Sequence, residues 1–206
     1  MKIAVIPARG QSRRLPRKNI LPFHGKPLIA HSIETALASG LFDQVYVSTE
    51  DHEIGAIAER YGAKVLRRDP KLAELDGAPD PGTQEITAVS IENLQAGGNE
   101  ITHACCIYAT APLMLAKDLH TGWNAVEVGE SRGIDFAMSV GIRPVRDAGQ
   151  WYWGTARAFL DREPLSLMGA NVMKVVLPDD RIQDINNLQD FQRAERLYAL
   201  MHKVAA

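Results

Sequence analysis

Short runs of apolar residues alternate with amphipathic stretches along most of the chain. The runs are rich in β-branched residues, which is typical of strands buried on both faces of a parallel sheet. The stretches between them carry apolar residues three and four positions apart, the spacing of one helix face. The pattern predicts strands over 3–6, 44–48, 64–66, 103–108, 135–140 and 171–177. It predicts helices over 29–39, 51–61, 84–95, 118–130 and 188–203.

Cap and breaker residues mark the ends of several of these helices. Thr49 and Thr83 precede helical stretches and are predicted to cap them, because a threonine hydroxyl accepts hydrogen bonds from the free amides of a first turn. Gly62 and the pair Gly97-Gly98 follow helical stretches, where glycine commonly ends a helix. Alternating strands and helices require right-handed crossovers, with helices on both faces of the sheet. We therefore expect an α/β fold with a doubly wound, mostly parallel sheet in a single domain of residues 1–206.

The first predicted strand leads into a strongly basic loop. Residues 1–33 carry seven Lys and Arg side chains and no acidic residue before Glu34, although the whole chain has 23 basic and 25 acidic residues. Pro7 has no N–H group and is expected to end the strand, and open α/β sheets bind ligands at the carboxyl ends of strands. The small Gly10 would let backbone amides close on an anion. The pattern favours a nucleoside triphosphate as ligand, and the alternative is a solvated basic surface.

Two common phosphate-binding motifs are absent from the sequence. It has no Gly-x-x-x-x-Gly-Lys-Ser/Thr motif, which excludes a P-loop ATPase, and no Gly-x-Gly-x-x-Gly motif for a dinucleotide. The long segment 67–82, rich in Pro, Gly and Asp, follows the third predicted strand. It is expected to lie beside the basic loop at the same sheet edge, as a surface loop that covers the nucleotide.

Composition narrows the class of protein further. The chain has 206 residues, 46% of them hydrophobic and 23% charged, as in globular proteins with a well-buried core. No apolar run approaches the ~20 residues of a membrane span, and the amino terminus leads into a strand instead of a signal peptide, so we expect a cytoplasmic protein without membrane contact. A net charge of −2 argues against nucleic-acid binding. Adjacent Cys105 and Cys106 point to opposite faces of a strand and are expected to pack in the core.

Motifs at the predicted strand ends resemble those of one family. Residues 6–10 read Ile-Pro-Ala-Arg-Gly and residues 17–19 read Arg-Lys-Asn, which is similar to the opening signature of the CMP-sialic acid synthetase (acylneuraminate cytidylyltransferase) family. Residues 108–113 and 147–154 are similar to the pseudaminic acid branch of that family, bacterial enzymes whose sugar decorates flagellin and surface polysaccharide. The resemblance spans nearly the whole chain. It departs at Gln11 and Arg13, where the family usually has Gly and Lys.

The resemblance implies both a fold and an activity. The fold would be that of the nucleotide-diphospho-sugar transferases, which is Rossmann-like, and the reaction would convert CTP and a nine-carbon keto-acid sugar to the CMP-sugar and pyrophosphate. The residues implied for catalysis are Arg9, Arg13, Lys18 and Asp184. Those implied for nucleotide binding are Ala8, Arg9, Gly10, Ser12, Lys18, Asn19 and Arg68. Those implied for sugar binding are Tyr108, Thr110, Gln150 and Tyr152.

The segment that supplies two of these sugar-site residues is unusually aromatic. Side chains alternate across a strand, so Trp151 and Trp153 are expected on one face and Gln150 and Tyr152 on the other. One face would pack in the core while the other contacts the sugar, although aromatic residues are more often core residues. Thr110 likewise has an alternative interpretation as an ordinary turn hydroxyl.

Residues 184–186, Asp-Ile-Asn, precede the last predicted helix. The family usually has Asp-x-Asp here, and the resemblance implies that Asp184 and Asn186 hold a catalytic Mg²⁺. A spacing of two in an extended segment puts both side chains on one face, as a hard cation with retained waters requires. The amide of Asn186 carries no charge, so the affinity for metal is expected to fall. The alternative is that both residues only cap the last helix.

Members of the family usually carry a long insertion after the fifth predicted strand, which forms dimer contacts and reaches into the neighbour's sugar site. In this chain only residues 141–146 join that strand to Asp147. Any homodimer is therefore expected to be weakened, and the sugar site altered. Two alternative functions stay open, namely a nucleotidyltransferase with another nucleotide or acceptor and a nucleotide-binding homologue with weakened catalysis.

Overall fold

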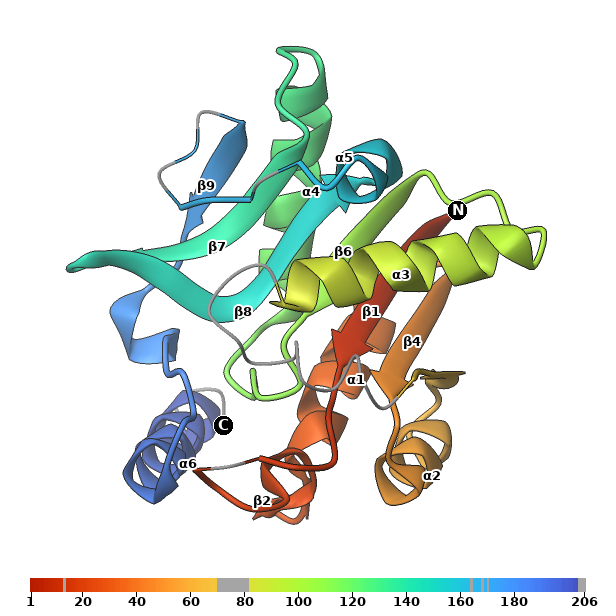
Figure 1. The fold of residues 1–206 in the computed structure, drawn as a ribbon. Helices are drawn as coiled ribbons and strands as arrows, with labels where there is room; N and C mark the ends of the chain where they lie inside the picture. Colours follow the sequence, from red (N-terminus) through yellow and green to blue (C-terminus); the bar gives the residue numbers. More distant parts are fainter. Residues whose placement is uncertain (13, 70–81, 164, 168, 170, 204–206) are drawn as a thin grey trace.

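The amino-terminal apolar run forms an inner strand of a seven-stranded sheet whose order is β5-β4-β1-β6-β8-β7-β9 (Figure 1). The computed structural model describes residues 1–12, 14–69, 82–163, 165–167, 169 and 171–203. Parallel pairing joins β1 to β4 and β6, β4 to β5, and β7 to β9. Among the described strands of this sheet, only β8 runs antiparallel to its neighbours, β6 and β7, so the expected mostly parallel sheet is confirmed. The strands are β1 (Lys2–Pro7), β4 (Gln44–Thr49), β5 (Lys64–Arg67), β6 (His103–Ile107), β7 (Phe136–Ile142), β8 (Val145–Thr155) and β9 (Val172–Val176).

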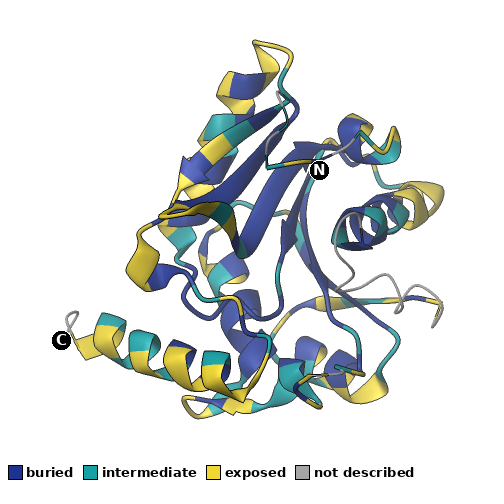
Figure 2. Cartoon of the chain, turned by 60° about the vertical axis from the view of Figure 1, so that its left-hand side comes forward, coloured by how far each residue is buried: buried dark blue, intermediate teal, exposed yellow. Residues whose placement is uncertain are grey.

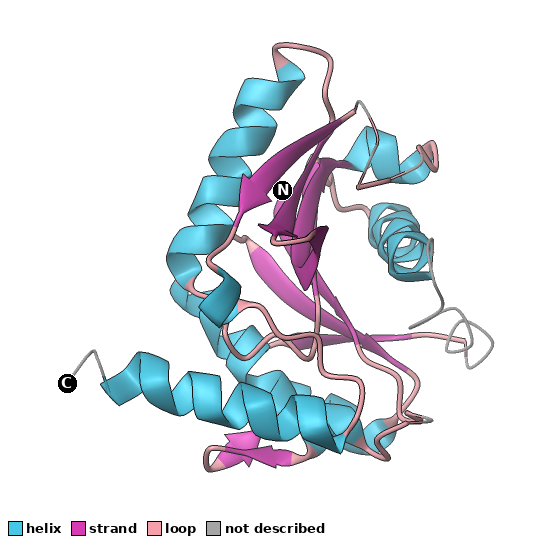
Figure 3. Ribbon diagram, turned by 90° about the vertical axis from the view of Figure 1, so that its left-hand side faces the viewer, coloured by secondary structure: helices cyan, strands magenta, loops and turns pink. Residues whose placement is uncertain are grey.

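Helices cover both faces of this sheet, as Figure 3 shows edge-on. On one face lie α1 (Leu28–Ala38), α2 (His52–Arg60) and α4 (Ala116–Glu130), and on the other lie α3 (Gly82–Ala96) and α5 (Ala156–Leu160). The period of two along β1 divides its side chains between the layers, because Ala4 and Ile6 pack in the α1 layer while Ile3 and Val5 pack in the α3 layer. The doubly wound arrangement is therefore confirmed.

A smaller unit lies beyond the carboxyl end of β1. It consists of the 3-10 turn η1 (Lys18–Ile20), the short strands β2 (Pro22–Phe23) and β3 (Lys26–Pro27), and α6 (Leu188–Lys203). The Phe23 ring lies 5.4 Å from the rings of both Phe191 and Tyr198, measured between centroids. Burial is confined to one side of α6, whose outer face is exposed (Figure 2). This contact holds the segment before α6 close to the loop that follows β1.

Two helix caps differ from the prediction. Thr49 is the last residue of β4, and the cap of α2 is Asp51, whose Oδ1 accepts from the amides of Glu53 and Ile54 at 2.9 Å. A carboxylate at the position directly before the helix reaches two free amides at once, which a hydroxyl two residues earlier does not. Thr83 lies inside the first turn of α3, where its hydroxyl oxygen accepts from the Tyr152 hydroxyl at 2.8 Å. Both predicted threonine caps are wrong.

Two strand boundaries also differ from the prediction. Pro7 ends the first strand, as expected, but it still belongs to the ladder, one residue beyond the predicted run: it pairs with Ser48, and the amide of Ala8 donates to the Ser48 carbonyl at 2.9 Å. The strand predicted over 135–140 continues to Ile142, which pairs with Val145 at the start of β8. Only Arg143 and Pro144 form the connection, a hairpin turn with a cis peptide bond.

The core agrees with the remaining expectations. Cys105 and Cys106 are buried, unoxidised thiols, one in each of the two layers beside the sheet. Burial raises the pKa of the Cys105 thiol well above its ordinary value. Within the ranges that the structure describes, no helix combines the length and the apolar character needed to cross a membrane.

Candidate functional site

Most of the side chains singled out from the sequence gather at one edge of the sheet. The parallel strands β1, β4, β5 and β6 all end there, so the loops that follow them are neighbours. Because β8 is antiparallel, its first residues reach the same edge, and the amide of Tyr108 donates to the Gln150 carbonyl at 2.9 Å. Arg13 and residues 70–81 of the expected covering loop lie outside the described residues.

Gly10 is held against the segment that follows β4. Its amide donates to Oε1 of Glu50 at 2.6 Å, so this amide is directed at a carboxylate of the protein. A Cβ atom added at Gly10 would lie 2.9 Å from Cβ of Asp51. The close approach of Asp51 therefore explains the glycine, a different reason from the backbone closure on an anion that the sequence suggested.

Arg17 joins the basic loop to the amino end of α2. It has a left-handed backbone, with φ of 56°, and its guanidinium lies 2.5 Å from Asp51 and 2.5 Å from Glu53. Burial of Asp51 works to raise the pKa of its carboxyl, but the hydrogen bonds from Arg17 and from the helix amides outweigh it, and the pKa is lowered overall. Arg17 thus fixes the loop to α2, and its positive charge is paired with carboxylates of the protein.

Two further contacts shape the loop and fix it to the segment before α6. Asn19 is buried, and its amide nitrogen donates to the Arg9 carbonyl at 3.0 Å, which closes the loop on itself. Nζ of Lys18 donates to the Ile185 carbonyl at 2.5 Å. The predicted nucleotide-binding lysine and the predicted metal-binding segment are therefore in direct contact.

Asp184 and Asn186 face each other, as their spacing of two predicts. Nδ2 of Asn186 donates to Oδ2 of Asp184 at 2.5 Å, and Oδ1 of Asn186 accepts from Arg14 at 2.6 Å. Asp184 is exposed and Ile185 between them is buried. The side chain that caps α6 is that of Asn187, whose Oδ1 accepts from the amide of Asp190 at 3.0 Å. The described geometry thus favours Asp184 and Asn186 as a pair of facing side chains over the alternative that they only cap α6.

Tyr108 stands where β6 ends, close to the same pair. Its hydroxyl donates to Asp147 at 3.4 Å, and the other oxygen of Asp147 accepts from the amide of Gly149 at 2.7 Å. Burial, followed by the negative charge of Asp147, raises the pKa of the Tyr108 hydroxyl well above its ordinary value. Gly149 has φ of 63°, and a Cβ added there would lie 3.7 Å from Cβ of Asp184. Tyr108 and Asp184 therefore belong to one cluster, and Thr110 is buried in the turn that follows Tyr108.

Gln150 and Tyr152 lie deeper than the sequence suggested. Nε2 of Gln150 donates to the Arg181 carbonyl at 2.6 Å, whereas Oε1 is buried without a hydrogen-bond partner among the described residues. Burial raises the pKa of the Tyr152 hydroxyl, which donates to Thr83. The expectation of one packed and one open face is wrong, because Trp151 and Tyr152 are buried in opposite layers of the core.

Glu50 and Asp51 also lie at this edge of the sheet, in contact with Gly10, Arg17 and Arg68, and the sequence did not single them out. Arg68, which it did single out, is buried, and its Nε and Nη2 donate to Oε2 of Glu50 at 3.1 and 3.0 Å. A signal was present, because both acids come within three residues of the end of the predicted strand 44–48 and must lie at the same sheet edge as the basic loop.

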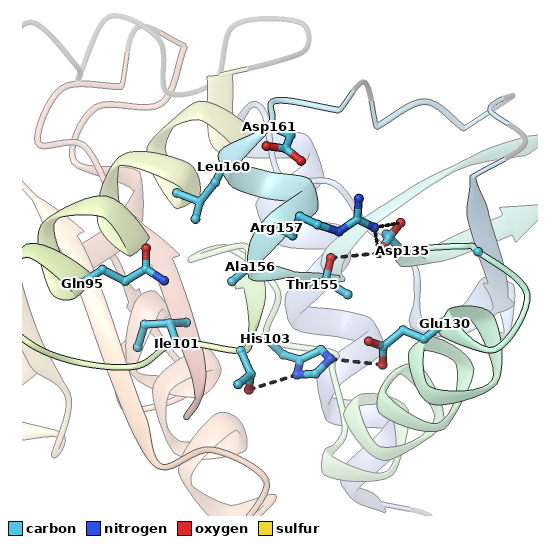
Figure 4. A pocket seen from close by; sticks show the side chains of 12 residues that line it. Gln95, Ile101, His103, Glu130, Asp135, Thr155, Ala156, Arg157, Leu160 and Asp161 are labelled. Atoms are coloured by element: carbon cyan, nitrogen blue, oxygen red, sulfur yellow. Dashed lines mark hydrogen bonds and ion pairs between the residues drawn. The ribbon is translucent and has the colours of Figure 1, made fainter.

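A pocket of about 670 Å³ lies at the opposite edge of the sheet (Figure 4). Four of its ionisable groups form two pairs, since His103 lies 3.2 Å from Glu130 and Arg157 lies 2.8 Å from Asp135. The Thr155 hydroxyl also donates to Asp135, at 3.0 Å. Among the described residues, none of the side chains predicted to bind nucleotide, sugar or metal lines this pocket.

Comparison with known proteins relates this geometry to an enzyme family. A family model described as Cytidylyltransferase matches residues 3–148. The chain is 34% identical to the pseudaminic acid cytidylyltransferase of Campylobacter jejuni strain 81-176, in an alignment that covers 98% of each chain. That alignment has 235 positions against the 206 residues here, so at least 29 positions are gaps on this side. The N-acylneuraminate cytidylyltransferase A of Danio rerio is 36% identical over 66% of this chain and 29% of that protein.

Solved structures share the fold. The CMP:2-keto-3-deoxy-manno-octonic acid synthetase in complex with CTP superposes with a TM-score of 0.70 at 17% identity, covering 98% of this chain and 99% of that chain. The likeness includes the mostly parallel sheet with helices on both faces. Taken with a family model that matches more than half of the chain and a relative 34% identical along nearly its whole length, these findings show that the chain belongs to the cytidylyltransferase family.

Proposed function

We propose that this protein transfers CMP from CTP to the anomeric hydroxyl of a nine-carbon keto-acid sugar, of pseudaminic or related sialic type, and releases pyrophosphate. The observation that carries the proposal is the contact between Lys18 and the Ile185 carbonyl. It joins the basic loop, which suits a triphosphate, to the one exposed carboxylate of the 184–186 pair. The curated relatives named as pseudaminic acid cytidylyltransferases support the choice of nucleotide and sugar class.

The basic loop would bind the triphosphate. Arg9 and Lys18 supply positive charge, and charge-assisted hydrogen bonds to phosphate oxygens are the stronger class of hydrogen bond. Ser12 adds a hydroxyl donor, while Ala8, Gly10 and Asn19 shape the loop from its buried side. Arg13 is also proposed to bind phosphate, and this role rests on the sequence alone. Arg68, fixed to Glu50, would meet the base side of the nucleotide.

A divalent cation fits this site only together with the nucleotide. Among the described residues, no group of three or more His, Cys, Asp or Glu side chains could hold a metal ion by itself. Mg²⁺ commonly binds one or two carboxylates and completes its shell with substrate phosphates and water. Asp184 supplies one exposed carboxylate, but Asn186 already uses its oxygen for Arg14 and its amide for Asp184. Asp184 would therefore hold the ion, and the bound ion would neutralise charge on the phosphates.

The chemical step needs little covalent work from the protein. The anomeric oxygen forms a bond to the α-phosphorus as the bond from that phosphorus to the pyrophosphate oxygen breaks, and the proton of the anomeric hydroxyl passes to water. The protein positions the two substrates and stabilises charge that spreads over the phosphate oxygens. Lys18 and Arg9 would stabilise that charge from the loop side, facing Asp184 across the site.

The sugar would rest on the Tyr108 side of the site. The Tyr108 hydroxyl and the exposed carboxylate of Asp147 offer polar groups at the sheet edge, and the buried turn with Thr110 forms the floor. Gln150 and Tyr152 would support the sugar-binding surface from the core, since Nε2 of Gln150 donates to the Arg181 carbonyl and the Tyr152 hydroxyl donates to Thr83.

We also propose that each subunit forms most of its own site. The turn of Arg143 and Pro144 is too short to reach a neighbouring subunit, so a homodimer would be weaker than in relatives with a longer segment. Light scattering of the purified protein across a concentration series tests this point. A stable dimer at nanomolar concentration would contradict it.

The nucleotide is tested by thermal unfolding with each nucleoside triphosphate in turn. We expect CTP to raise the melting temperature by mass action, and ATP, GTP and UTP to do so less at equal concentration. A larger shift with GTP or ATP would indicate a nucleotidyltransferase of another specificity. A shift with CTP but no turnover with any sugar would indicate a nucleotide-binding homologue that has lost catalysis.

A further inference from the structure

Glu50 connects three strand ends through a single carboxylate. It follows β4, and its Oε1 accepts from the amide of Gly10 in the loop after β1 at 2.6 Å. Its Oε2 accepts from Nε and Nη2 of Arg68, just after β5, at 3.1 and 3.0 Å. Because β4 lies between β1 and β5 in the sheet, Glu50 fixes the separation of the two outer segments across the middle one.

The surroundings make this contact sensitive to substitution. The Arg68 side chain is 3% exposed and that of Glu50 is 18% exposed, so the ion pair is largely removed from water. Removal of one partner from a buried pair leaves the other charge uncompensated, which costs far more than loss of an exposed pair. A lone carboxylate would also repel a triphosphate bound to the neighbouring loop, and Arg68 neutralises that charge.

We propose that Glu50 is a positioning residue for the nucleotide, which sets the Arg68 guanidinium and the Gly10 end of the basic loop so that both meet CTP in one binding event. The proposal rests on the proposed function, since it assigns a role within the same site. Glu50 touches no reacting atom in this arrangement. Its effect therefore falls on nucleotide affinity and on selectivity for the base, and the rate at saturating CTP changes little.

Three substitutions separate the two halves of the contact. Glu50→Gln keeps a neutral oxygen for the Gly10 amide but removes the charge that Arg68 pairs with. Glu50→Asp keeps the charge on a shorter side chain, and Glu50→Ala removes both contacts. Without Glu50 to fix it, Arg68 no longer holds its position toward CTP, and loss of one charge-assisted hydrogen bond to the nucleotide corresponds to about a tenfold change in equilibrium. We therefore expect the Kd for CTP to rise about tenfold in Glu50→Gln and more in Glu50→Ala, which also releases the Gly10 amide.

The experiment is calorimetric titration of CTP and UTP into the wild type and each variant, with thermal unfolding as a check of folding. Glu92→Gln, on α3, is the matched control, because it removes the carboxylate of an ion pair with Arg162, away from this edge. Its Kd for CTP should equal that of the wild type. The preference for CTP over UTP should narrow in Glu50→Gln and recover in part in Glu50→Asp.

A double variant shows whether Glu50 acts through Arg68. If it does, Glu50→Gln combined with Arg68→Met should bind CTP no more weakly than Arg68→Met alone. A wild-type protein that binds no CTP would overturn the proposed function. A wild type that binds CTP with the same Kd as a folded Glu50→Gln variant would overturn the role of Glu50 and leave the proposed function standing. A lower turnover rate in Glu50→Gln with an unchanged Kd for CTP would also overturn the role of Glu50.

Discussion

Replacement of Asn186 by Asp restores a carboxylate at a position where this chain has an amide. In the structure, Nδ2 of Asn186 donates to Oδ2 of Asp184 at 2.5 Å. Asn186→Asp removes that donor and places a second carboxylate beside the first. Without a cation the two carboxylates repel each other, and with a cation they form a pair of anionic ligands on one face.

The size of this repulsion follows from the distance between the two carboxylates and from their exposure to water. Two unit charges about 4 Å apart in water repel by about 1 kcal/mol, and the water value applies because Asp184 is exposed. A new ion pair with Arg14, which already donates to residue 186, offsets part of the lost hydrogen bond. A net loss of about 1 kcal/mol lowers the melting temperature by roughly 2–4 °C in a protein of this size. Because a bound cation relieves the same repulsion, the Kd for the metal ion should be roughly fivefold lower in Asn186→Asp than in the wild type.

Thermal unfolding without nucleotide, with and without Mg²⁺ or Mn²⁺, measures both effects, and Mn²⁺ binding followed by electron paramagnetic resonance gives the affinity directly. Asn187→Asp is the matched control. It adds the same charge one residue later, where the side chain caps α6 and an acid is favourable. We expect Asn186→Asp to melt lower without metal and to gain more from metal than either wild type or control. Equal melting temperatures and equal metal responses in all three proteins would refute the metal assignment of this segment.

Further predictions concern the loop, the core and the pH dependence of stability. Lys18→Ala should raise the KM for CTP and also the metal requirement, because Lys18 contacts Ile185 beside Asp184; steady-state kinetics at varied CTP and Mg²⁺ would show a change in CTP alone if that contact does not matter. Gly122→Ala should destabilise the protein by about 1–3 kcal/mol, since a Cβ there would lie 2.5 Å from the Trp151 ring, and an unchanged urea midpoint would contradict this packing. Burial lowers the pKa of His31 to about 4, so between pH ~6.5 and 4 the unfolded chain binds a proton that the folded protein does not, and stability falls with falling pH. Urea unfolding at pH 7 and 4.5 should show a smaller fall in His31→Gln than in the wild type.

Periodicity predicted the sheet well because its signal is spread over many residues. Ile3–Ile6 had to be a buried strand, and the family-like loops after it and after β6 had to meet at one edge once the sheet was parallel. The antiparallel β8 was less evident. The short connection before Asp147 is informative in retrospect, since a parallel crossover needs a dozen or more residues and a two-residue turn admits only a hairpin.

The site was harder to predict, because its contacts join residues far apart in the sequence. Glu50 acquires its role only when β1, β4 and β5 are neighbours, and Asn186 acquires Arg14 as a partner across 172 positions. Tyr152 carries an aromatic ring that suits either a core or a ligand surface, and its depth in the sheet decides for the core. The family resemblance singled out the Asp184 segment as a candidate metal site, but it could not predict the hydrogen bonds that Asn186 makes to Arg14 and Asp184.

Pyrophosphate release tests the central claim most directly. The purified protein would be assayed with CTP, Mg²⁺ or Mn²⁺, and a panel of sialic, legionaminic and pseudaminic acids, with the CMP-sugar measured in the same reactions. We predict release that requires CTP, a divalent cation and one of these keto-acid sugars together, with one CMP-sugar formed for each pyrophosphate, and loss of release in Asp184→Ala. Saturable binding of CTP by the folded protein, with no pyrophosphate released from CTP in the presence of any of these sugars, would contradict the account.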